Sequence, residues 1–194
     1  MKLSIDLVSP TPGAWSEAVK ADFDSFLQDH ANCERKASGM SMGLVSKYPN
    51  RKEIIPMLIE TALEELEHFQ QVYQIMEKRG VPLKQEMEKD PYIQALMQHL
   101  RGPSDQRFMD YLLMVSIIEV RGCERFKLVS ELLEDEKLKK FYKHLWTTEA
   151  KHGHIFVKMA LEYFPEEEVY ARLRELNEIE SKIVVSLPPR AALH

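Results

Sequence analysis

The chain has 194 residues, of which 44% are hydrophobic and 29% are charged, which is enough for one compact domain with a substantial core. Its net charge of −5 creates no global positive field, so a nucleic-acid partner would require a local basic patch. The longest apolar stretch, residues 111–118, is far shorter than the roughly 20 residues of a membrane span. These quantities argue against a membrane-spanning protein and favour a single domain over residues 1–194.

Apolar residues recur at alternating steps of three and four along most of the chain, which predicts an all-α fold. The first two long helices are expected over about 14–47 and 53–79. A crossover helix over about 90–100 then leads to a third long helix over about 105–133 and a fourth over about 137–164. A C-terminal helix is expected over about 166–184. Four long helices with a long crossover and an extra C-terminal helix indicate a ferritin-like four-helix bundle.

The most informative motif is a Glu followed about thirty residues later by Glu-x-x-His, and this motif occurs twice. Thirty residues is the distance needed to run up one helix, turn and return to the same level. One Glu from each of two helices and Glu-x-x-His from each of two others form the ligand set of carboxylate-bridged di-iron and di-manganese sites. The residues concerned are Glu34, Glu65, His68, Glu119, Glu149 and His152.

Several of these polar residues occupy positions that belong to the apolar core. Glu119 falls on the apolar stripe of residues 108–133, and Glu149 and His152 fall on the stripe of residues 138–163. Burying four carboxylates without counter-charge would cost many kcal/mol or force their protonation, so cations are required. Oxygen and nitrogen ligands suit iron or manganese better than thiolate-seeking metals. The sequence therefore predicts a dinuclear site and does not distinguish iron from manganese.

Glu124 competes with Glu119 for the ligand position on the third helix. The string Cys123-Glu124-Arg125 repeats Cys33-Glu34-Arg35, which would pair Glu124 with Glu34. Helix geometry favours Glu119, because Glu124 would lie five residues, or about 7.5 Å, off the common level. Glu124 is then expected near the site or in a charge pair.

His30 precedes Glu34 by one helical turn on the same stripe. It is either a core histidine with a satisfied hydrogen bond or an outer partner that orients a metal ligand. Cys33 and Cys123 lack the spacing of a zinc site and are expected to be small buried side chains. The first ten residues lack the basic and apolar regions of a signal peptide, so we expect a cytoplasmic protein.

Three longer strings surround the motif residues and are far more specific than Glu-x-x-His alone. They are residues 29–40 (DHANCERKASGM), 62–69 (ALEELEHF) and 119–126 (EVRGCERF). Through them the chain resembles the tRNA 2-methylthio-isopentenyl-adenosine hydroxylase family, MiaE, over roughly residues 15–165. By this resemblance the family's iron ligands fall on Glu34, Glu65, His68, Glu119, Glu149 and His152.

The resemblance implies a non-haem di-iron monooxygenase that hydroxylates the isopentenyl group of the modified adenosine in tRNA. Its cofactors would be two iron ions, with O2 as co-substrate. The chain has no nucleotide-binding glycine motif and no rubredoxin-like cysteine set, so a separate ferredoxin or flavin reductase is expected as electron donor. The tRNA-docking surface is not evident, because the chain has no dense basic tract. It has two short clusters of common type, Lys47, Arg51 and Lys52, and Lys139, Lys140 and Lys143.

Other functional classes remain open at this point. A ferritin-like ferroxidase or iron-handling protein would use the same ligands, but it should form a hollow multimeric shell. A di-iron hydroxylase of another small apolar substrate, such as a quinone, should present an apolar face for docking on a membrane. A metal-free helical interaction module would bind no iron at all. The sequence fixes neither the oligomeric state nor the prenyl carbon that is oxidised.

Overall fold

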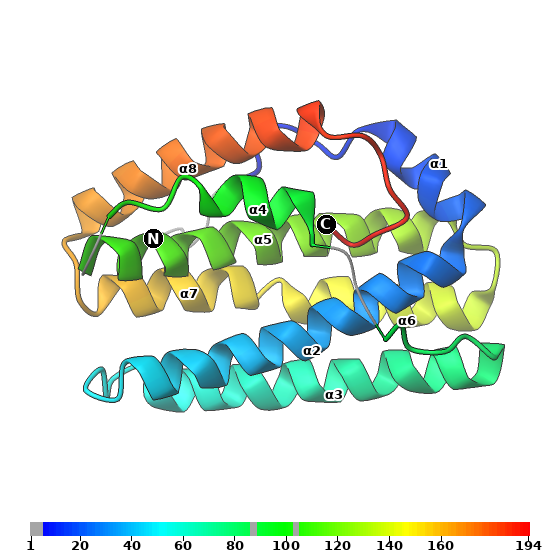
Figure 1. Ribbon diagram of the computed structural model, residues 1–194, viewed down its shortest axis with the longest axis horizontal. Helices are drawn as coiled ribbons and strands as arrows, with labels where there is room; N and C mark the ends of the chain where they lie inside the picture. Colours follow the sequence, from blue (N-terminus) through cyan, green and yellow to red (C-terminus); the bar gives the residue numbers. More distant parts are fainter. Residues whose placement is uncertain (1–5, 86–88, 103–104) are drawn as a thin grey trace. The chain divides into compact units, whose positions relative to one another are not determined.

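The computed structural model describes residues 6–85, 89–102 and 105–194, and all regular structure within these residues is α-helical (Figure 1). None of the described helices combines the length and apolarity of a membrane span. The described residues form two compact units: unit 1 comprises residues 6–17, 89–102, 105–189 and 194, and unit 2 comprises residues 18–85 and 190–193. The helices are α1 (Gly13–Ala21), α2 (Phe23–Lys47), α3 (Ile55–Arg79), α4 (Pro91–Met97), α5 (Asp105–Leu132), α6 (Glu136–Glu149), α7 (His152–Leu161) and α8 (Glu166–Ser186).

Unit 2 is built on a hairpin of two long helices, α2 and α3, which lie side by side and run in opposite directions (Figure 1). Ser38 Oγ donates a hydrogen bond to the Ala62 carbonyl at 2.8 Å and ties the two helices together. α3 ends at Gly80, whose φ of 70° lies in the left-handed region that favours glycine. The buried apolar side chains of the hairpin are Phe26, Leu27, Ala31, Leu44, Leu58, Ala62, Val72 and Met76.

The first long helix expected from the sequence is interrupted at Asp22, where α1 ends and α2 begins. Asp22 has φ −145° and ψ 69°, and its carboxylate accepts a hydrogen bond from the Ser25 backbone N–H at 3.0 Å. The hydrogen bonds from Ser25 also lower the pKa of this carboxyl. Such a cap satisfies one of the free N–H groups at a helix start. The apolar spacing continues across the break, which is why periodicity alone predicts one helix.

Unit 1 places α5 beside α6 and α7, and α8 packs against both α4 and α5 (Figure 1). α6 begins after Asp135, whose carboxylate accepts hydrogen bonds from the backbone N–H groups of Lys137 and Leu138 at 2.8 and 3.1 Å. The stripes expected on the third and fourth helices are largely buried. Their buried members include Phe108, Leu112, Phe126, Val129, Tyr142, Leu145, Phe156 and Met159.

The fourth long helix of the sequence prediction is divided into α6 and α7, with Ala150 and Lys151 between them. Both residues keep right-handed helical dihedral angles, with φ/ψ of −53°/−23° for Ala150 and −75°/−29° for Lys151. The Lys151 carbonyl accepts hydrogen bonds from the N–H groups of His154 and Ile155, both at 3.0 Å. α6 and α7 therefore follow one another as two parts of a single long helix.

Candidate metal centre

Unit 2 brings Glu34, Glu65 and His68 together. Each residue offers one ligand atom, and these atoms lie within 4.8 Å of one another. Glu34 comes from α2, whereas Glu65 and His68 are three residues apart on α3 and so share one face of that helix. His68 Nδ1 lies 3.9 Å from Glu34 Oε2 and 3.9 Å from Glu65 Oε2. The two carboxylates are buried, and the His68 side chain is 13% exposed.

Unit 1 brings Glu119, Glu149 and His152 together in the same way. Their ligand atoms also lie within 4.8 Å of one another. Glu119 comes from α5, while Glu149 is the last residue of α6 and His152 the first of α7. Glu149 and His152 are buried, Glu119 is half-buried, and His152 Nδ1 is in close contact with Glu149 Oε2. Each unit thus holds one Glu/Glu/His triad.

The chemistry of each triad fits a divalent metal ion. Two carboxylates and one neutral imidazole carry a charge of −2, which a single divalent cation balances. Without a cation, the negative charges of two carboxylates held this close would repel each other. The donors are oxygen and nitrogen with no thiolate, a set that suits iron or manganese.

His30 contacts one of the triad carboxylates directly. Its Nε2 lies 2.6 Å from Glu34 Oε1, and the imidazole is fully buried. The ring of Phe26 lies 5.9 Å from the imidazole, centroid to centroid. This contact fits both roles open from the sequence, a core histidine with a satisfied hydrogen bond and an outer partner of a candidate ligand.

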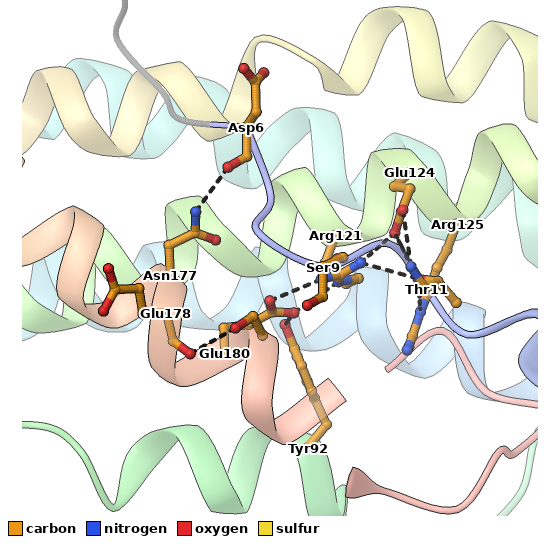
Figure 2. Close-up of polar contacts among 11 residues, drawn as sticks. Asp6, Ser9, Thr11, Tyr92, Arg121, Glu124, Arg125, Asn177, Glu178 and Glu180 are labelled. Carbon is orange, nitrogen blue, oxygen red and sulfur yellow. Dashed lines mark hydrogen bonds and ion pairs between the residues drawn. The ribbon is translucent and has the colours of Figure 1, made fainter. Parts of the chain in front are cut away.

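Glu124 lies in a charge pair, one of the two places expected for it from the sequence. Its carboxylate accepts hydrogen bonds from Arg121 Nη1, from the Thr11 N–H at 3.0 Å and from Thr11 Oγ1 at 2.6 Å (Figure 2). Among the described residues, the α5 acid that clusters with Glu149 and His152 is Glu119.

Arg121 is the centre of a buried polar network in unit 1 (Figure 2). Its guanidinium donates two hydrogen bonds to Glu180, from Nε to Oε1 at 2.8 Å and from Nη2 to Oε2 at 2.9 Å. Tyr92 Oη donates to Glu180 Oε1 at 2.9 Å, and Arg121 Nη2 donates to the Ser9 carbonyl at 2.8 Å. The network joins the N-terminal segment, α4, α5 and α8, and it therefore fixes the helix that carries Glu119.

The arginine and tyrosine side chains of this network stay in the protonated forms that donate hydrogen bonds. Burial alone would lower the pKa of Arg121, but the hydrogen bonds and charge of Glu180 raise it above its ordinary value. Burial, and then the charge of Glu180, raise the pKa of Tyr92, so its hydroxyl stays protonated. Arg125 lies 5.0 Å above the Trp15 ring, and burial lowers its pKa to about 10. Both guanidinium groups are therefore charged at neutral pH.

The sequence pattern does not predict this network. Arg121 and Arg125 stand four residues apart on α5 between core positions, which is a local signal of buried charge. The partner acid, Glu180, is 59 residues away from Arg121 in the chain. No helical periodicity connects two such distant positions.

Gly153 allows α7 to approach α5 closely next to His152. Ser116 Oγ donates a hydrogen bond to the Gly153 carbonyl at 2.6 Å. A Cβ atom on Gly153 would lie 2.6 Å from Val120 Cγ2 and 3.4 Å from the Ser116 carbonyl oxygen. A glycine at this position therefore keeps His152 at its present distance from α5.

The chain matches a known protein family over almost its whole length. The model of the family described as tRNA-(MS[2]IO[6]A)-hydroxylase (MiaE) matches residues 3–194. The chain is 35% identical over 185 residues to the tRNA 2-(methylsulfanyl)-N(6)-isopentenyladenosine(37) hydroxylase of Pseudomonas putida, which covers 95% of this chain and 89% of that protein. It is 25% identical over 226 residues to the protein of the same name from Salmonella typhimurium, which covers 91% of this chain and 83% of that protein.

A solved structure is similar over almost the whole chain. It is described as protein 43 with aldehyde deformylating oxygenase activity from Synechococcus. The TM-score is 0.89 at 32% sequence identity, and the match covers 95% of this chain and 92% of the other. This similarity and the all-helical structure confirm the all-α, ferritin-like fold class predicted from the sequence.

Proposed function

Because the chain belongs to the tRNA-(MS[2]IO[6]A)-hydroxylase family, MiaE, we propose that it is a monooxygenase that hydroxylates the isopentenyl group of 2-methylthio-isopentenyl-adenosine in tRNA. The observation that carries this proposal is the presence of a Glu/Glu/His triad in each unit. A hydroxylase that uses O2 needs a redox-active centre, and the side chains of the chain alone supply none. The two triads provide the ligands for such a centre.

We propose further that the two triads together hold two iron ions in one dinuclear centre. The four carboxylates carry a charge of −4, which two divalent cations balance. The absence of thiolates from the donor set disfavours a structural zinc site, and reaction with O2 favours iron over the other metals that suit oxygen and nitrogen ligands. The six ligands would be Glu34, Glu65, His68, Glu119, Glu149 and His152.

When bound, the two irons would activate O2, so that one oxygen atom enters a C–H bond of the isopentenyl group and the other leaves as water, with two electrons from the external donor and two protons. The side chains of this protein hold and order that centre. His30 Nε2 fixes Glu34 Oε1, which directs the second oxygen of Glu34 toward His68 Nδ1. The burial of Glu65 and Glu149 keeps bulk water away from two of the ligands.

The substrate and the electron donor are separate molecules in this proposal. The names of the relatives support tRNA as the substrate. The donor would be a ferredoxin or a flavin reductase, because the chain contains only two cysteines and no nucleotide-binding glycine motif. Neither cysteine forms a disulfide, and both are half-buried rather than buried as expected from the sequence.

The direct experiment tests metal content and product together. The purified protein is loaded with ferrous iron, chemically reduced and exposed to O2 with tRNA that carries 2-methylthio-isopentenyl-adenosine. We expect about two irons per chain and a nucleoside heavier by one oxygen atom in mass spectrometry. The variant Glu149→Gln should bind only about one iron and yield no hydroxylated nucleoside. Glu162→Gln, at an exposed position after α7, should keep the full iron content and the product. A metal-loaded protein that yields no hydroxylated nucleoside would contradict the proposal.

A second candidate activity is aldehyde deformylation, because the similar structure from Synechococcus carries that activity in its description at 32% identity. The same metal-loaded protein is incubated with a long-chain aldehyde, O2 and reductant. Release of formate, together with no product from tRNA, would favour this activity over tRNA hydroxylation.

A further inference from the structure

One face of α6 and α7 carries a row of exposed cationic residues, which we call the basic face. It consists of Lys137, Lys140, Lys143, Lys151 and Lys158, all of which are exposed. At 100° per residue these five positions fall within one arc of about 120° around the helix axis. The helical dihedral angles at the junction of α6 and α7 carry the row across it. At 1.5 Å per residue, the row extends for about 30 Å.

The basic face differs in charge from the rest of the protein. Residues 137–161 contain six lysines and a single acid, Glu149, so this segment carries +5 in a chain whose net charge is −5. Glu149 is buried and belongs to the metal triad of unit 1, so it does not neutralise the surface. Lys139, the sixth lysine, lies 3.7 Å from Glu136 and is left out of the basic face.

Two exposed histidines, His144 and His154, lie on the same side of α6 and α7. At 100° per residue, Glu149 and His152 point to the opposite side of this long helix, where they are buried. The lysines therefore face solvent while the same helix presents the metal ligands to the interior of unit 1. A partner held on the basic face would lie directly against the helix that carries two of the six candidate ligands, Glu149 and His152.

We propose that the basic face binds the sugar-phosphate backbone of the tRNA substrate; the inference rests on the proposed function. Lysine side chains neutralise phosphates as point charges, and the release of condensed cations from RNA drives such binding. A row of about 30 Å with one sign of charge fits an extended polyanion better than a compact protein. The acidic remainder of the chain repels RNA, which would limit docking to this face. Phosphate contacts set position and leave base recognition to the site itself.

The test compares two triple variants with equal changes in charge. The docking variant carries Lys140→Gln, Lys143→Gln and Lys158→Gln. The control carries Lys127→Gln on α5 with Arg174→Gln and Lys182→Gln on α8; these three residues are also exposed in unit 1 but lie outside the basic face. Binding of tRNA with the isopentenylated adenosine is measured by fluorescence anisotropy between about 50 and 200 mM salt. Thermal melting of each variant checks that it is folded.

We expect the docking variant to bind tRNA at least about tenfold more weakly at the lower salt concentration, and the slope of log K against log salt to fall by about two to three. The control should stay within about twofold of the unsubstituted protein. Equal affinity and equal slope for the docking variant and the control would overturn the inference.

Three further outcomes identify which proposal has failed. If the docking variant keeps its tRNA affinity but is reduced more slowly by an acidic electron-transfer protein, the basic face serves that protein and the inference is overturned. If the unsubstituted protein hydroxylates isopentenylated tRNA while both triple variants bind it normally, the inference fails and the proposed function stands. If the unsubstituted protein neither binds nor hydroxylates this tRNA, the proposed function itself fails, without reference to any variant.

Discussion

His30 and Glu34 are one helical turn apart on α2, and His30 Nε2 lies 2.6 Å from Glu34 Oε1. The imidazole is fully buried, and the ring of Phe26 lies near it. One oxygen of this carboxylate is already held by His30 before a metal binds. The side chain therefore loses less conformational entropy on metal binding.

Replacement of His30 should weaken metal binding without removing a ligand. His30→Leu keeps an apolar side chain in the buried space but abolishes the hydrogen bond to Glu34, so we expect iron affinity to fall about 10- to 100-fold. Competition with a chromophoric chelator measures this affinity. His30→Gln, which can still donate a hydrogen bond, should recover part of it. An exposed histidine variant, His144→Leu, serves as the control.

The two candidate acids on α5 should behave differently. Glu119→Gln should lose one metal ion, because the carboxylate clusters with Glu149 and His152. Glu124→Gln should keep both metal ions but lower the free energy of unfolding by about 1 to 2 kcal/mol, because Arg121 and Thr11 lose a charged acceptor. Elemental analysis and urea unfolding measure the two effects. The reverse result would assign the metal to Glu124.

The pair Arg121 and Glu180 should contribute strongly to the stability of unit 1. Glu180→Gln removes one of the two carboxylates that pair with the fully buried Arg121 guanidinium and leaves only Glu124, so we expect a loss of about 1.5 to 3 kcal/mol in the free energy of unfolding. Glu178→Gln, an exposed change on the same helix, should have an effect below about 0.5 kcal/mol. Chemical denaturation followed by circular dichroism compares them. Equal stability of the two variants would show that the buried pair adds little.

Any side chain at position 153 should destabilise the protein unless Val120 on α5 moves. In Gly153→Ala the new methyl group would lie 2.6 Å from Val120 Cγ2, and we expect a loss of about 1 to 3 kcal/mol in stability together with weaker iron binding. Val120→Ala removes the clashing methyl group, so the double variant should recover much of both losses. A double-mutant cycle measures this coupling. Additive effects would mean that the close approach is unimportant.

Asp110 should make the protein sensitive to acid. Burial alone would raise the pKa of Asp110, but hydrogen bonds from Arg101 and Arg172 lower it below its ordinary value. A lowered pKa in the folded state gives stability that is present above the unfolded pKa of about 3.9 and is lost as pH falls through the folded value. Asp110→Asn should therefore lower Tm at neutral pH and flatten its fall below about pH 4. The exposed Glu162→Gln should leave the Tm profile nearly unchanged. Parallel profiles for all three proteins would contradict this account.

Features that depend on the local spacing of residues could be predicted from the sequence. Glu119 stands at a core position of a regular apolar stripe, so its type and spacing were enough to single it out, and the structure brings it to Glu149 and His152. The helical class and the positions of the long helices followed from the same periodicity, which reports the side of a helix that is buried.

Features that depend on contacts between distant segments were not accessible. The acid that pairs with Arg121 lies on α8, and the hydrogen bond from Ser116 to Gly153 joins two different helices. The break at Asp22 was missed for another reason: the apolar spacing continues through it, and only the hydrogen bond from Ser25 marks the new helix. His30 was recognised as a candidate partner of Glu34, but its contact with that carboxylate is visible only in the folded chain.

The opposite placement of the lysines and the metal ligands on α6 and α7 restricts changes in chain length. A single residue inserted between Lys143 and Glu149 would turn the two sides by 100° relative to each other. Lys137, Lys140 and Lys143 would then be rotated by about 100° around the helix axis relative to Lys151 and Lys158. Only a change of about seven residues, close to two full turns, would restore the alignment. Substitutions in this segment are therefore far easier to accommodate than insertions or deletions.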